Sequence, residues 1–241
     1  MADSPLLIVS GIFLLAGLVK GMVGLGLPTI AMGLLCLLMQ PVEAAAFVVI
    51  PNALTNAWQM IGGASFAALA RRLALLLIGL AMGTFASISL LASGSGSIAA
   101  ALLGLVLVAY GLHGLTSTQI EVDPKYERLA SPVTGAVSGL LNGATGVFVV
   151  PSTPYLASLR MSKDELIQSV GMLAFTAAIT LGAALWLSGR YSATDMSWVG
   201  LVPAVVGMYM GLRIRRRLNP DLFRRWFLAG LVLLGGYMLF R

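Results

Sequence analysis

Cysteine and histidine are nearly absent from this chain, which has one of each among 241 residues. The lone Cys36 has no partner for a disulfide within the chain, and it cannot build a cysteine-based metal site. A single histidine excludes the HExxH zinc motif, and the sequence contains neither a P-loop nor a Gly-x-Ser-x-Gly elbow. We therefore expect no metal and no cofactor, and we do not expect an enzyme.

Charge is also scarce, because only 10% of the residues are charged while 59% are hydrophobic. Soluble domains carry about 25% charged residues, so a water-soluble fold is excluded. The apolar runs do not alternate with polar residues as β-barrel strands do. The net charge is +6, but the arginines lie at the edges of the apolar runs, which fits membrane orientation better than nucleic-acid binding. The composition predicts an all-α, multi-pass membrane protein.

Two of the apolar runs are too long for a single crossing, which takes about 20 residues. The runs are 6–39, 44–70, 73–93, 97–119, 131–159, 166–187, 196–212 and 226–240. The basic residues between them are Arg71, Arg72, Lys125, Arg128, Arg160, Lys163, Arg213, Arg215, Arg216, Arg217, Arg224 and Arg225. All of these lie on the cytoplasmic side only if the run 131–159 enters and returns on one side. Both long runs are therefore predicted to be hairpins, with both termini outside.

The two predicted hairpins have related sequences. Each contains a glycine-rich stretch, "GLVKGMVGLGLP" at 17–28 and "GLLNGATGVFVVP" at 139–151, where we expect the helix to break. When residues 17–48 are shifted by 122, nine positions are identical: Gly17/Gly139, Leu18/Leu140, Gly21/Gly143, Gly24/Gly146, Leu34/Leu156, Leu37/Leu159, Met39/Met161, Glu43/Glu165 and Val48/Val170. This indicates an internal duplication.

Each repeat is then one broken, re-entrant hairpin followed by three transmembrane helices, and the two repeats have opposite orientation. The first repeat covers 1–119, a cytoplasmic loop covers 120–130, and the second repeat covers 131–241. Inverted repeats with broken helices are typical of secondary transporters, which bind their substrate where the breaks meet.

At these glycine-rich stretches the chain resembles the TauE/SafE family of bacterial membrane proteins. The residues that carry the resemblance are "GLVKGMVGLGLPTIAMGLL" and "GLLNGATGVFVVPSTPYL", one in each half. Many members have consecutive glycines before a proline, whereas this chain has Gly24-Leu25-Gly26 in the first half and only Gly146 in the second. Asn142 stands where Lys20 stands. The resemblance implies a transporter of sulfite or organosulfonates.

The hairpin tips are the first candidate for the substrate site. A lysine at bilayer depth costs about 2.5–3.5 kcal/mol, so such a residue usually serves a site. Helix N-termini bind anions through backbone N–H groups. We expect the substrate to lie between the two tips, held by Lys20, Gly21, Gly24, Asn142, Gly143, Thr145 and Gly146. The alternative is that Lys20 extends to a headgroup and that the glycines only allow close helix packing, as in GxxxG contacts.

Asn52, Asn56 and Gln59 form a second candidate, because their spacing places them on one face of a helix. Neutral donors of this kind suit an oxyanion, and the alternative is hydrogen bonding between helices. Glu43 and Glu165 follow the two hairpins at equivalent positions. They are either proton-coupling carboxylates or first-turn acids favoured by the helix dipole. His113, near the inner end of a span, is either a third proton-coupling group or a packed or interfacial histidine.

We therefore predict a secondary transporter or facilitator for small sulfur-containing anions, with export favoured. Few carboxylates lie within the spans to carry a coupled cation, and a negative interior drives anions outward. The alternatives are a proton- or cation-coupled importer of another small organic anion, an intramembrane enzyme, and a scaffold subunit. The expected partners are sulfite or a sulfonate, membrane lipid and a second copy of the chain in a homodimer, and not nucleic acid.

Overall fold

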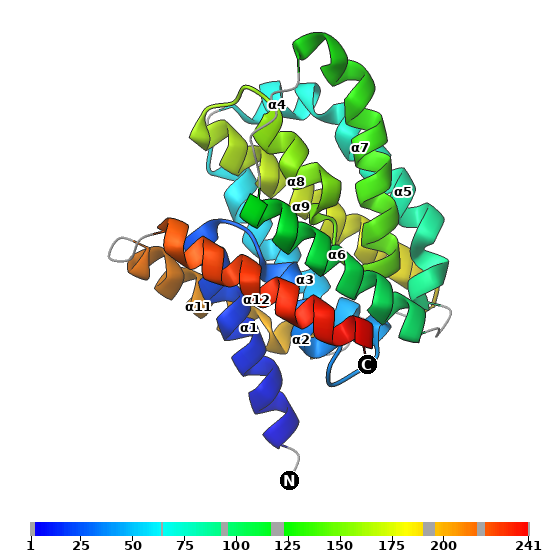
Figure 1. The fold of residues 1–241 in the computed structure, drawn as a ribbon, viewed down its shortest axis with the longest axis vertical. Coiled ribbons are helices and arrows are strands. Elements are labelled where there is room, and N and C mark those ends of the chain that lie inside the picture. Colours follow the sequence, from blue (N-terminus) through cyan, green and yellow to red (C-terminus); the bar gives the residue numbers. More distant parts are fainter. Residues whose placement is uncertain are drawn as a thin grey trace. The chain divides into compact units, whose positions relative to one another are not determined.

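The chain folds into helices joined by short turns in the computed structural model, which describes residues 3–63, 65–92, 96–116, 123–189, 196–215 and 220–240 (Figure 1). Among these residues there is no strand. The helices are α1 Asp3–Val23, α2 Leu27–Leu35, α3 Pro41–Ile61, α4 Phe66–Arg72, α5 Ala74–Ala92, α6 Gly96–Thr116, α7 Pro124–Thr145, α8 Val149–Ser158, α9 Lys163–Leu187, α10 Met196–Val199, α11 Leu201–Ile214 and α12 Pro220–Phe240. Arg216 and Arg217, two of the residues used to orient the chain, lie outside the described ranges.

Five of the helices in the described ranges are long and apolar enough to cross a membrane. The spans are Leu6–Val23, Ala74–Ala92, Gly96–Thr116, Lys163–Leu187 and Leu222–Phe240, and Leu201–Ile214 is a shorter apolar helix. Large apolar side chains such as Leu7, Met82 and Leu233 are exposed on these helices. Exposed leucine and methionine on helices of this length match a lipid environment, so the all-helical membrane protein expected from composition is confirmed.

Both glycine-rich stretches break a helix, as the sequence predicts. α1 ends at Val23 and α2 begins at Leu27, while α7 ends at Thr145 and α8 begins at Val149. The backbone at the breaks has φ of 85° at Gly24, 111° at Gly26 and 74° at Gly146. Residues with a Cβ rarely adopt positive φ, so these glycines are what allow the helices to end there.

Three helix boundaries of the two hairpins are equivalent. The ends of their first helices, the starts of their second helices and the starts of the helices that follow are each 122 residues apart, at Val23 and Thr145, Leu27 and Val149, and Pro41 and Lys163. This is the shift that aligns the nine identical positions in the sequence. The duplication read from the sequence is therefore matched by an equal division into helices.

The structure differs from the expected segments at two places. Residues 124–130, expected in a loop, form the first turns of α7. Asp123 caps this helix by accepting a hydrogen bond from the Lys125 amide (3.0 Å), and Pro124 begins it. Asp followed by Pro is a helix-start signal that the polar composition hides. The run 44–70 contains two helices, because Gly62 and Gly63 separate α3 from α4.

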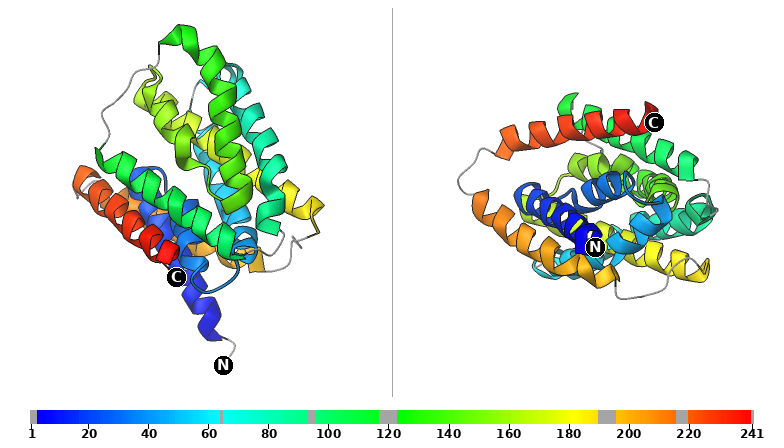
Figure 2. Two further views of the ribbon diagram at one scale, coloured as in Figure 1. Left: turned by 45° about the vertical axis from the view of Figure 1, so that its right-hand side comes forward. Right: turned by 90° about the horizontal axis from the view of Figure 1, so that it is seen from below.

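The chain forms two compact units, each built from both halves of the sequence. Unit 1 comprises the described residues of Met1–Pro51, Gly96–Thr116 and Ser192–Arg241, and unit 2 those of Asn52–Ser95 and Ser117–Tyr191. In unit 1, α1 packs against α11 and α6 packs against α12. In unit 2, α5 packs against α7 and α9. Figures 1 and 2 show α6 beside α12, and α5 beside α7.

Glycines make the closest of these helix contacts. A Cβ added at Gly17 would meet the backbone of Ala204 on α11, and one added at Gly207 would meet that of Leu14 on α1. In unit 2, Gly83 and Gly139 lie against α7 and α5 in the same manner. Small residues let membrane helices approach closely, so each hairpin is docked through its first helix by glycine-mediated backbone packing.

Candidate substrate site

The tip of the second hairpin, in unit 2, holds a buried amide whose hydrogen bonds stay within the protein. Asn142 is 1% exposed, and its Nδ2 donates to Thr84 Oγ1 and to the carbonyl of Ala177, both at 3.1 Å. Both amide hydrogens are thus used in this conformation, which leaves Oδ1, an acceptor. Asn142 ties α7 to α5 and α9 in this arrangement. Its contact with substrate stays a prediction.

Thr145 and Gly146 shape the end of α7. The Thr145 hydroxyl donates to the Leu141 carbonyl (2.7 Å) and accepts from the Val147 amide (3.2 Å). The Gly146 amide donates to the Asn142 carbonyl at 2.7 Å. Both residues are buried at the start of the segment that leads into α8. This short loop is therefore fixed by its own hydrogen bonds before α8 begins.

The first helix of the first hairpin, in unit 1, ends with a hydrogen bond equivalent to that between Gly146 and Asn142. The Gly24 amide donates to the Lys20 carbonyl at 2.7 Å, and Lys20 is 3% exposed in the last turn of α1. A Cβ added at Gly24 would meet no atom within 4 Å, so this glycine faces open space. Lys20 and Gly24 thus combine a buried cationic side chain with an open backbone position, as a binding role would require.

Gly21 and Gly143, also predicted as substrate residues, lie in helix contacts. A Cβ at Gly21 would meet the backbone of Met208 and Leu212 on α11, and one at Gly143 would meet the Thr84 carbonyl on α5. This geometry is the packing alternative considered for these glycines. Any contact that they make with substrate would be through backbone atoms only.

The second helix of each hairpin begins at a buried residue without a side-chain cap. Gly26 is the N-cap of α2 and Phe148 is the N-cap of α8. Neither residue has a side chain that caps its helix by hydrogen bonding to the first turn. Leu27, Phe148 and Val149 are at most 1% exposed. The first N–H groups of a helix have no partner within it, and a buried helix start needs one from elsewhere. These two helix starts are suited to an anion.

Asn52, Asn56 and Gln59 lie on the part of α3 that belongs to unit 2. Asn56 Nδ2 donates to both the carbonyl and Oδ1 of Asn52, each at 2.7 Å, and both residues are under 5% exposed. Gln59 Nε2 donates to the Ile167 carbonyl of α9 at 2.9 Å. The predicted shared face is thus present for the two asparagines, while Gln59 makes the interhelical hydrogen bond of the alternative interpretation.

Glu43 and Glu165 make contacts of helix N-termini. Glu43 is exposed, and its Oε2 accepts from the Gln40 amide at 3.3 Å. Glu165 Oε2 accepts from both the amide and the hydroxyl of Ser162 at 2.9 Å, which completes a capping box. These are the contacts expected for first-turn acids. His113 is exposed near the end of α6. A proton-coupling role for the three stays a prediction.

Four polar residues near these elements were not singled out from the sequence. Thr84 receives Asn142, and Gln168 bridges the α3–α4 turn by donating to the carbonyls of Met60 (2.8 Å) and Gly63 (3.0 Å). Thr153 Oγ1 on α8 is the one buried side-chain polar atom without a partner among the described residues. Tyr155 is described below. A glutamine within an apolar run is a signal that could have identified Gln168, but Thr84 has none.

The described residues contain no cluster of three or more histidine, cysteine, aspartate or glutamate side chains that could hold a metal ion. Lys20, Gly21 and Gly24 belong to unit 1, and the other predicted substrate residues belong to unit 2.

Neither the curated proteins nor the solved structures gave a match to the chain. The family described as sulfite exporter TauE/SafE matches residues 9–238, nearly the whole chain. The chain therefore belongs to the TauE/SafE family of membrane transporters.

Proposed function

We propose that this protein is a secondary transporter or facilitator that moves sulfite or organosulfonates across the bacterial inner membrane, with export as its direction. The observation that carries the proposal is the pair of buried, uncapped helix starts at Leu27 and Val149, one in each hairpin. Membership of the TauE/SafE family supports the substrate class. The tip of each hairpin, one in unit 1 and one in unit 2, is a candidate site for the substrate.

The electrostatics of the hairpins favour a small oxyanion. The N-terminus of a helix carries roughly half a positive charge, and its N–H groups point along the axis toward a ligand. At α2 the cap is Gly26, which packs against the side chains of Phe227 and Val19, and Pro28 contributes no N–H. Lys20 adds a basic side chain in the last turn of the preceding helix. At α8 the helix is interrupted at Val150 (φ −110°, ψ 131°), so α2 provides the more regular anion site.

The two asparagines of α3 supply neutral hydrogen bonds. The buried Asn52 carbonyl and Oδ1 are both used by Asn56, which leaves the Asn52 amide hydrogens for a sulfonate or sulfite oxygen. Neutral donors select an oxyanion over a cation without holding it as tightly as an added lysine would. A transporter must release its substrate, so one cation supported by neutral donors suits turnover.

The membrane potential favours export. Moving one charge across 100 mV is worth about 2.3 kcal/mol, so a negative interior drives anions out of the cell. A coupled importer needs titratable groups, and the candidates Glu43, Glu165 and His113 lie at helix ends. Coupled import of another organic anion is the second candidate function, and it predicts dependence of the flux on a proton gradient.

Flux in proteoliposomes tests the proposal. Vesicles loaded with sulfite or methanesulfonate, with a potassium diffusion potential negative inside, should release the anion faster than protein-free vesicles, and reversing the potential should slow the release. Phosphate and chloride serve as competing anions. Folded protein that moves neither sulfite nor a sulfonate would contradict the proposal. Flux that follows an imposed pH gradient and not the potential would favour the coupled importer.

A further inference from the structure

The second helix of the second hairpin has little stability of its own. α8 is 10 residues long, contains Pro151 and Pro154, and departs from helical geometry at Val150. Isolated helices shorter than about 12–15 residues are marginal even with good helix formers, and an internal proline removes a backbone hydrogen bond. The position of α8 therefore depends on what it contacts in unit 2.

Side-chain hydrogen bonds connect α8 to α7 at two levels. Near the tip, the Ser152 amide donates to Ser138 Oγ at 3.1 Å, and Ser138 is fully buried. Further from the tip, the Tyr155 hydroxyl lies 2.8 Å from Ser131 Oγ and donates to the Glu127 carbonyl at 3.1 Å. Later residues of α8 bond to earlier residues of α7, so the two helices run antiparallel and are fixed at both levels.

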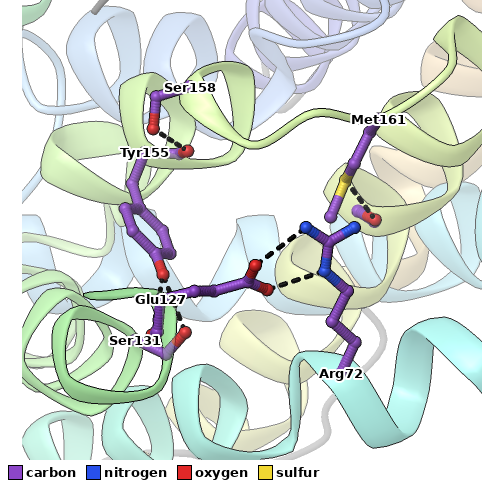
Figure 3. Close-up of polar contacts among 7 residues, drawn as sticks. Arg72, Glu127, Ser131, Tyr155, Ser158 and Met161 are labelled. Carbon is purple, nitrogen blue, oxygen red and sulfur yellow. Dashed lines mark hydrogen bonds and ion pairs between the residues drawn. The ribbon is translucent and has the colours of Figure 1, made fainter. Parts of the chain in front are cut away.

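Glu127 extends this connection to α4. Its carboxylate pairs with the Arg72 guanidinium through two parallel bonds, Nε to Oε1 at 2.6 Å and Nη2 to Oε2 at 2.8 Å (Figure 3). The hydrogen bond with Glu127 raises the pKa of Arg72 above its ordinary value. Two-bond arginine–carboxylate pairs hold both orientation and distance. We call Arg72, Glu127, Ser131, Ser138 and Tyr155 the polar tether of the second hairpin.

The equivalent positions of the first hairpin lack the polar side chains of this tether. The positions 122 residues before Glu127, Ser131, Ser138, Ser152 and Tyr155 are Pro5, Val9, Ala16, Ile30 and Gly33. None of these has a polar side chain. α2 contacts α1, α6 and α12, and Gly33 lies against the side chains of Leu107 and Leu234. Two hairpins with three equivalent helix boundaries are therefore anchored differently.

We propose that the polar tether fixes α8 in the second hairpin, and that α2, the equivalent helix of the first hairpin, which lacks such a tether, is the one that moves during transport. Hydrogen bonds require a fixed donor–acceptor distance, whereas apolar contacts between side chains are non-directional and allow a helix to slide. Arg72, Glu127 and Tyr155 are positioning residues in this account, because they act on substrate through the placement of α8. The inference rests on the proposed function for its reference to transport.

Hydrogen–deuterium exchange of the protein in nanodiscs tests the anchoring without substrate. We expect amides of α8 to exchange at least tenfold more slowly than amides of α2. Tyr155→Phe removes both tether bonds of that side chain and should bring α8 to the exchange rate of α2. Arg72→Glu should loosen α8 as well, and Arg72→Glu combined with Glu127→Arg should restore its protection by rebuilding the ion pair. Equal exchange of α2 and α8 in the unmodified protein would overturn the proposal.

A matched pair of thiols tests the movement. Cys36, the sole cysteine, follows α2, and Ser158, which is 122 residues later, ends α8; both are partly exposed. Maleimide labelling of Cys36 in the native chain should change at least threefold when methanesulfonate is added. Labelling of Ser158→Cys in a Cys36→Ser background should change less than 1.5-fold. A larger change at 158 would overturn the proposal.

The two tests are separable from the proposed function. Protein that transports no sulfur anion but shows slow exchange of α8 retains the anchoring half of the inference and loses the proposed function. Protein that transports sulfite but exchanges α2 and α8 equally retains the function and loses the tether.

Discussion

Lys20 and Asn142 occupy the same place in the two hairpins and differ in chemistry. The carbonyl of each accepts the amide of the glycine that ends the helix, at 2.7 Å in both cases. One position carries a cationic side chain and the other a neutral amide that is bonded to Thr84 and Ala177. A chemical difference between the hairpins is therefore already present at a single residue pair.

Replacing Lys20 separates function from stability. Lys20→Met keeps the length of the side chain and removes its buried amine, and the melting temperature shows how much that amine contributes to stability. Sulfite flux should fall at least tenfold if the charge attracts the anion. Thermal unfolding and flux are measured on the same preparation, and Lys163→Met, at an exposed position of α9, serves as the control. Unchanged flux would remove Lys20 from the site.

Replacing Asn142 should act first on stability. Asn142→Ala removes the two hydrogen bonds that join α7 to α5 and α9, each worth about 0.5–1.5 kcal/mol, so we expect a loss of stability of about 1–3 kcal/mol. Thr84→Val removes one of the two amide contacts and should cost less. Chemical denaturation of both variants measures the two losses of stability and shows which is larger. Full stability of Asn142→Ala with loss of flux would instead make Asn142 a substrate contact.

The sequence allowed prediction of only part of the site at this scale. Gly24 and Gly146 could be identified because a glycine in an apolar helix marks a break. The partners of Asn142 could not be identified from the sequence. Thr84 and Ala177 come from helices whose contact with α7 depends on tertiary packing. Gly21 and Gly143 fitted both a site and a helix contact, and only the packing geometry distinguishes these uses.

At the scale of helices, glycine faces determine which elements dock. Gly17 of α1 lies against Ala204 of α11, and Gly83 of α5 lies against α7. The GxxxG spacing is visible in the sequence but the partner helix is not, because a small-residue face accepts any helix that approaches closely. The early start of α7 was missed for a different reason, since polar residues of its first turns resemble a loop.

Two glycines of α1 provide a matched test of this docking. A Cβ at Gly17 would meet the Ala204 backbone, which cannot move aside, whereas a Cβ at Gly11 would meet nothing within 4 Å. Gly17→Ala should therefore lower stability by about 1–3 kcal/mol through overpacking. Gly11→Ala should be neutral or stabilising by up to about 1 kcal/mol through helix propensity. Thermal melting in detergent compares them, and equal effects would exclude a tight α1–α11 contact.

At the scale of the whole chain, the helix boundaries of the hairpins follow the sequence duplication, but the compact units do not follow the repeats. Unit 1 takes α1, α2 and α6 from the first half and α11 and α12 from the second. A shift of 122 residues is visible in the sequence because identities are counted along the chain. Packing between helices that are distant in the sequence produces no repeated pattern of residues. The helices that make up each unit could therefore not be predicted.

The orientation of the chain also yields a prediction. If both hairpins return to the side from which they enter, both termini lie outside the cytoplasm. Alkaline phosphatase fused at the C-terminus should then be active, and a fluorescent protein fused there should be dark. A fluorescent protein fused after Arg215, beyond α11, should be bright, as the basic residues there require. The reverse pattern would mean that at least one hairpin crosses the bilayer.

The docking of α1 on α11 can take place only late in biosynthesis, because α11 is synthesised long after α1. About 180 residues separate the end of α1 from the start of α11, and a ribosome adding about 5–20 residues per second needs roughly 10–40 s to make them. During that interval the first hairpin is in the bilayer without its permanent neighbour. A nascent chain released before residue 201 would leave the glycine face of α1 available to other membrane helices, and quality-control proteases would meet it in that state.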